Sequence, residues 1–146
     1  MGMFNNITTM GLIKRQSFII PEATVLNMDE NNQFILIANS SIFYTIILGC
    51  YIQNNGNAKY GNYNKLNLTQ INGNSPDTII GYIEESPQGI DNNQLSSMLI
   101  NIRYNGSTKI IGTESRQSTK LYWETLPTSG DGDLTVTLLY FNLNKI

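Results

Sequence analysis

Carboxylates are the only side chains in this sequence that could carry acid–base chemistry. The chain has no histidine, so Ser-His-Asp and Cys-His nucleophile systems would lack their base. A glycosidase needs two carboxyl groups held about 5 to 9 Å apart, one of them with a raised pKa, and the spacing of the acidic residues indicates no such pair. The candidates are Glu84, Glu85, Glu114, Glu124, Asp131 and Asp133. We therefore expect no catalytic residues and no enzymatic activity.

Metal and cofactor sites are not indicated either. Asp131 and Asp133 in "SGDGD" are two hard oxygen ligands, but the EF-hand glutamate is missing, and a tight turn before the last strand explains the same residues. Cys50 is the only cysteine, and zinc sites need histidine or several cysteines. Its neighbours in "IILGCYI" predict a small buried residue. The sequence also lacks the glycine-rich loops that bind phosphate.

A tyrosine- and amide-rich segment is the best candidate for molecular recognition. "YIQNNGNAKYGNYN" places Tyr51, Tyr60 and Tyr63 among asparagines and glycines. Stiff aromatic rings beside amide hydrogen-bonding groups are typical of adaptable binding surfaces. The segment could bind a sugar or a protein, or its tyrosines could instead cover the edge of the fold.

The positions of the apolar residues predict an all-β protein. No segment has a convincing helical period, although 23–32 and 92–99 could each hold a helical turn. Asn105-Gly106 is the clearest hairpin turn, and Trp123 is expected in the core. Strand-like runs occur at 17–20, 33–38, 42–52, 65–71, 78–84, 97–104, 108–111, 119–125 and 134–143. Short strands at this spacing predict one antiparallel β-sandwich or jelly-roll-like domain of eight or nine strands.

The first residues have no strand pattern. We assign 1–16 to an extended N-terminal arm and 17–146 to the sandwich. The arm carries only two charges, Lys14 and Arg15, and it has the apolar residues Met1, Met3, Phe4, Met10, Leu12 and Ile13. It is either a frayed terminus or an arm that lies on a neighbouring subunit.

The last strand is apolar on both faces at its end. Leu134, Val136, Leu138 and Tyr140 share the face expected in the core, because side chains alternate along a strand. Thr135 and Thr137 start the other face, which continues with Leu139, Phe141 and Leu143. Such an apolar area is unusual on a monomer. Either the chain's own N-terminal segment or another subunit is expected to cover it.

Composition argues against highly charged partners. The net charge is −2, only 14% of residues are charged, and 20 are asparagine, whereas charged residues make up roughly 25% of a typical domain. We expect no nucleic-acid binding. The start of the chain lacks a secretory signal pattern, and its longest apolar run is too short to span a bilayer. We expect a soluble protein made in a cytoplasm, with no membrane partner.

Three stretches resemble small virion proteins of tailed bacteriophages. They are "FIIPEATVLNMDENNQFILIAN", the tyrosine-rich loop followed by "NKLNLTQ", and the ending "LYWETLPTSGDGDLTVTLLYFNL". The resemblance covers most of 17–146 and is one of layout. The asparagine-rich composition is similar to that of phages of gut bacteria, including the crAss-like group.

The resemblance implies a β-sandwich structural protein of the virion, a decoration or auxiliary capsid subunit or a head-fibre subunit. It implies other virion proteins as partners, such as the major capsid protein, and a homo-oligomer or high-copy assembly. The expected interface residues are Met3, Phe4, Leu12, Ile13, Leu139, Phe141 and Leu143. The alternative is an oligomeric fibre tip or a carbohydrate- or receptor-binding module that uses Tyr51, Tyr60 and Tyr63.

Overall fold

The computed structural model describes residues 13–70, 78–84, 90, 95–100 and 118–144. This part of the chain contains eight strands and one short helix. The strands are β1 (Lys14–Ile20), β2 (Phe34–Ile37), β3 (Phe43–Asn54), β4 (Lys65–Gln70), β5 (Thr78–Glu84), β6 (Leu95–Ile100), β7 (Thr119–Trp123) and β8 (Leu134–Asn144). The helix α2 (Glu22–Val25) follows β1 directly.

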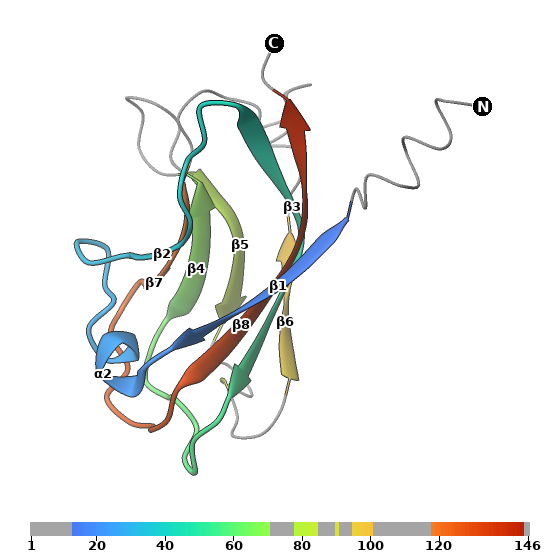
Figure 1. Cartoon of the computed structure of the whole chain (residues 1–146). Helices are drawn as coiled ribbons and strands as arrows, with labels where there is room; N and C mark the ends of the chain where they lie inside the picture. The colour runs from blue at the N-terminus through green and yellow to red at the C-terminus, as the bar shows by residue number, and fades with distance from the viewer. Residues whose placement is uncertain (1–12, 71–77, 85–89, 91–94, 101–117, 145–146) are drawn as a thin grey trace.

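The strands form two antiparallel layers that pack face to face (Figure 1). One layer has the order β1-β8-β3-β6 and the other β5-β4-β7-β2. The layers are joined where β6 pairs with β5, at Gly81↔Ile100 and Tyr82↔Leu99. β1 and β2 lie at the two ends of this order and do not pair with each other, so the described strands form a β-sandwich and not a closed barrel.

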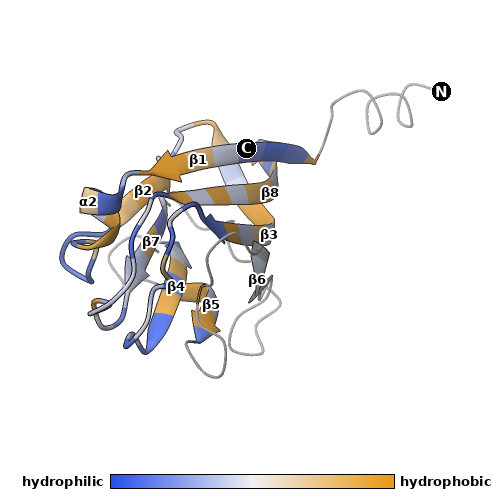
Figure 2. Ribbon diagram, turned by 90° about the horizontal axis from the view of Figure 1, so that it is seen from below, coloured by the Kyte–Doolittle hydropathy of each residue, from blue (hydrophilic) through white to orange (hydrophobic). Residues whose placement is uncertain are grey.

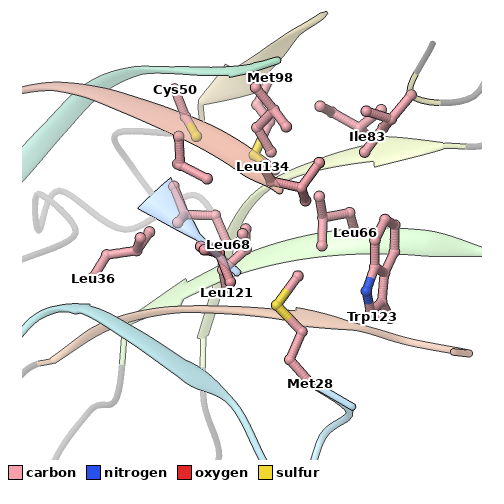
Figure 3. Packing of buried hydrophobic residues seen from close by; sticks show 14 of the residues in the cluster. Met28, Leu36, Cys50, Leu66, Leu68, Ile83, Met98, Leu121, Trp123 and Leu134 are labelled. Carbon is pink, nitrogen blue, oxygen red and sulfur yellow. The ribbon is translucent and has the colours of Figure 1, made fainter. Parts of the chain in front are cut away.

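The core lies between the two layers and is made by alternate residues of their strands (Figure 3). Leu66 and Leu68 of β4 and Leu134 of β8 have no exposed surface. Trp123 is equally buried, and its indole N–H donates a hydrogen bond of 2.8 Å to the carbonyl of Val25. This bond satisfies the polar atom of a buried indole and joins α2 to β7.

The predicted β-sandwich is confirmed, with differences at several elements. β1 begins at Lys14, three residues before the expected strand, because Lys14, Arg15 and Gln16 all pair with β8. The expected helical turn at 92–99 is wrong over 95–99, which belong to β6. The predicted strand at 108–111 and the predicted turn at Asn105-Gly106 lie outside the described residues.

Other single-residue expectations are confirmed. Cys50 is fully buried, and so is the predicted inner face of β8, except that Tyr140 keeps 8% of its surface exposed.

No helix among the described residues is long and apolar enough to cross a membrane.

Candidate functional site

The outer face of β1, β8 and β3 is the surface on which the candidate interface residues meet. Residues directly opposite each other in an antiparallel pair project from the same side of the sheet. Arg15, Ser17 and Ile19 of β1 lie opposite Leu139, Thr137 and Thr135 of β8. These residues of β8 lie in turn opposite Gly49, Tyr51 and Gln53 of β3. The face therefore combines three separate parts of the sequence, β1, β3 and β8, which only folding brings together.

Part of this face is apolar and exposed. Ile19 is 66% exposed, Ile13 is 64% exposed, and Leu143 at the end of β8 is 38% exposed. Leu139 and Phe141 are half-buried. We call Ile13, Ile19, Leu139, Phe141 and Leu143 the outer apolar row. The expected interface residues Met3, Phe4 and Leu12 lie outside the described residues.

The chain covers one part of the row itself. Ile46 lies opposite Phe141, and it is buried although it does not belong to the main core cluster. The sequence left open whether the N-terminal segment or another subunit covers this strand end, and the half-burial of Leu139 and Phe141 within the chain accounts for part of that cover. Ile13, Ile19 and Leu143 remain accessible to a partner.

A hollow of about 310 Å³ lies in the same face, lined by Arg15, Tyr51, Thr137 and Leu139. Gly49 lies beside two of these residues, and a Cβ at this position would make ordinary van der Waals contact, at 3.5 Å, with the side chains of Leu139 and Tyr51. The hollow therefore combines an aliphatic side chain and an aromatic ring with a guanidinium and a hydroxyl group. Of the three tyrosines predicted to form a recognition loop, only Tyr51 contributes to this hollow.

Tyr60 and Tyr63 belong to the core instead, which corrects the prediction that they present a recognition surface. Tyr60 is 0% and Tyr63 is 2% exposed. Their ring centroids lie 5.8 and 4.6 Å from that of Trp123. The hydroxyl of Tyr60 donates a hydrogen bond to the carbonyl of Gly132. Both tyrosines thus cover the edge of the sandwich, the other outcome that the sequence left open.

The "SGDGD" segment is a structural turn. Asp131 Oδ1 accepts hydrogen bonds from the backbone N–H groups of Asn57 (2.6 Å) and Ala58 (2.8 Å). Asp133 Oδ1 accepts one of 2.9 Å from the N–H of Glu22, at the start of α2. Among the described residues no three acidic or cysteine side chains come together in a group that could hold a metal ion.

A second polar surface was not predicted from the sequence. Lys65 of β4 lies opposite Glu84 of β5, and its carbonyl accepts a hydrogen bond of 2.8 Å from the N–H of Glu124. The Lys65 ammonium lies 4.6 Å from the centroid of the Tyr82 ring, which is 45% exposed. This cation–π contact orders an aromatic face at the surface of the second sheet. Only the pairing of β4 with β5 reveals the cluster, because its residues are far apart in sequence.

The chain is therefore an antiparallel β-sandwich, and the outer face of its β1, β8 and β3 strands is partly apolar. Comparisons with protein-family models, with curated proteins and with solved structures find no match. The proposals below therefore rest on the chemistry of the described surfaces and on the layout of the sequence.

Proposed function

We propose that the protein is a non-enzymatic structural component of a tailed-phage particle, attached to the capsid shell as an auxiliary or decoration subunit. The outer apolar row is the observation that carries this proposal. Its residues Ile13, Ile19 and Leu143 expose apolar surface that a stable neighbour would remove from water. The resemblance of the sequence layout to phage virion proteins supports a tailed-phage virion as the particle.

Burial of this face would supply the energy of attachment. At roughly 25 cal/mol per Å², hiding about 800 Å² of apolar surface contributes about 20 kcal/mol before the costs of association are subtracted. Polar groups on the same face, from Arg15 and Thr137, would give the contact its orientation. Many copies on one shell would multiply the effect.

The test is to place charges on the exposed part of the row. We expect Ile13→Asp combined with Leu143→Asp to fold normally, because both side chains are exposed, and to be lost from purified virions of the phage that encodes the chain. Ile79→Asp is the matched control, since Ile79 is equally apolar and 46% exposed but lies on β5 of the other sheet. Mass-spectrometric copy number is the measurement. Complete absence of the unmodified chain from virions, or equal incorporation of both variants, would overturn the proposal.

A second candidate function is glycan or receptor binding through the second sheet. The exposed ring of Tyr82, held beside Lys65, favours it, because aromatic faces next to polar groups bind sugars and proteins. In that case Tyr82→Ala should decrease binding to host cells or glycans by at least about tenfold, as expected for the loss of roughly 1.4 kcal/mol. Tyr51→Ala, on the opposite layer, should leave this binding unchanged.

A further inference from the structure

β1 is an open edge of the sandwich. It pairs with β8 on one side, and no described strand pairs with it on the other. It extends over seven residues without a register shift, Lys14 to Ile20. The backbone N–H and C=O groups on the free side of such a strand are a template for another strand.

The opposite edge of the molecule has features that prevent such pairing. β2 has only four residues, and its register with β7 shifts between Ile35 and Ile37. Short length and bulges are common ways in which proteins protect sheet edges from association. β1 lacks both features and has no internal proline, and its only charged residues, Lys14 and Arg15, stand at its start. Of the two edges, β1 is therefore the better template for another strand.

The charges on β1 suit pairing with a second copy. Lys14 and Arg15 stand at one end of the strand, and the other end is Phe18-Ile19-Ile20. Figure 2 shows the same change, from hydrophilic at the start of β1 to hydrophobic at its end. In an antiparallel pair of identical strands, the charged end of each copy lies beside the apolar end of the other. Like charges are therefore kept apart.

We propose that two copies of the chain pair through β1, antiparallel, about a two-fold axis at Ser17. This register uses all seven residues, with Arg15 opposite Ile19 of the second copy and Lys14 opposite Ile20. The two Arg15 residues are then about 13 Å apart along the strand direction, beyond the screening length of about 8 Å at physiological salt.

The dimer has one continuous sheet of eight strands, β6-β3-β8-β1 followed by the same strands of the second copy. Because the axis is perpendicular to the sheet, both outer faces lie on the same side. Ile19 of each copy contributes to a single joined surface. This inference concerns the isolated protein and holds whatever the outer face binds.

The test uses charge at position 19 of the full chain, measured by sedimentation velocity over a concentration series. Ile19 is exposed, so its substitution leaves the fold intact. We expect Ile19→Lys, which places a lysine opposite Arg15 twice per dimer, to raise the dissociation constant by about tenfold or more. Ile19→Glu places an opposite charge there and should keep the dimer. Adding Arg15→Glu to Ile19→Lys should restore it.

Ile35→Lys is the matched control, because Ile35 lies on the short, irregular β2 edge, and this variant should dimerise like the unmodified chain. A chain that is monomeric at every concentration would overturn the proposal. Equal weakening of the dimer by Ile19→Lys and Ile19→Glu would also overturn it, because this result would indicate an apolar contact without the proposed register.

Hydrogen exchange of the unmodified chain gives a readout without any variant. Protection of β1 amides should increase with protein concentration, and concentration-independent exchange would contradict the pairing. Virion incorporation is measured separately, so the two proposals can fail independently.

Discussion

At the scale of single residues, the turn before β8 shows how a few side chains determine the path of two loops. Gly130 and Gly132 have φ angles of +113° and +93°, in the region that favours glycine. A Cβ on Gly132 would overlap the backbone of Gly56. The two glycines thus allow the turn to approach the 54–61 loop, and Asp131 then binds that loop through its backbone amides.

The role of Asp131 gives a stability prediction. Asp131→Ala should lower the free energy of unfolding by about 0.5–1.5 kcal/mol, because it removes the acceptor of two hydrogen bonds from the exposed N–H groups of Asn57 and Ala58. Urea unfolding followed by circular dichroism measures the change. Asp131→Asn keeps a side-chain oxygen in the same place and should lose clearly less. If both variants lose the same stability, the geometry of the two hydrogen bonds does not determine the effect.

At the scale of elements, the strands could be predicted where a local pattern determines them. Leu134, Val136 and Leu138 alternate with threonines, and this alternation correctly identified the inner face of β8. The start of β1 could not be predicted in this way. Lys14 and Arg15 are in a strand because β8 pairs with them, and an edge strand tolerates polar side chains on its exposed surfaces.

The candidate site was only partly predictable for the same reason. The outer residues of β8 were identified from alternation, but their neighbours come from β1 and β3, and sequence spacing does not reveal such pairing. The register shift between Ile47 and Gly49 in β3 changes which side chains lie opposite Leu139. The sequence could not decide between a recognition surface and an edge cover for Tyr60 and Tyr63, because their burial depends on contacts with Trp123 and Gly132, more than 50 residues away in sequence.

At the scale of the whole molecule, packing the two sheets together encloses groups that ionise at alkaline pH. Burial raises the pKa of the Cys50 thiol from 9.0 to about 12. The pKa of Tyr60 is also raised, first by burial and then by the negative charges of Glu22, Asp131 and Asp133. In both cases the folded protein disfavours the charged form. The unfolded chain releases these protons at lower pH than the folded chain.

Stability should therefore be constant with respect to these two groups below pH 9 and decrease above it. Between pH 9 and about 12 the unfolded chain ionises Cys50 while the folded chain keeps it protonated, which costs up to about 1.4 kcal/mol of stability per pH unit. Tyr60 adds to the loss above pH 10, where the tyrosines of the unfolded chain ionise. Urea unfolding at a series of pH values from 8 to 11 measures how steeply stability falls with pH.

Cys50→Ala is the control variant. It should be less stable than the unmodified chain at pH 8, because it leaves a small cavity, but its stability should decline less between pH 9 and 10. An identical decline in the variant and the unmodified chain would contradict the assignment of the slope to Cys50.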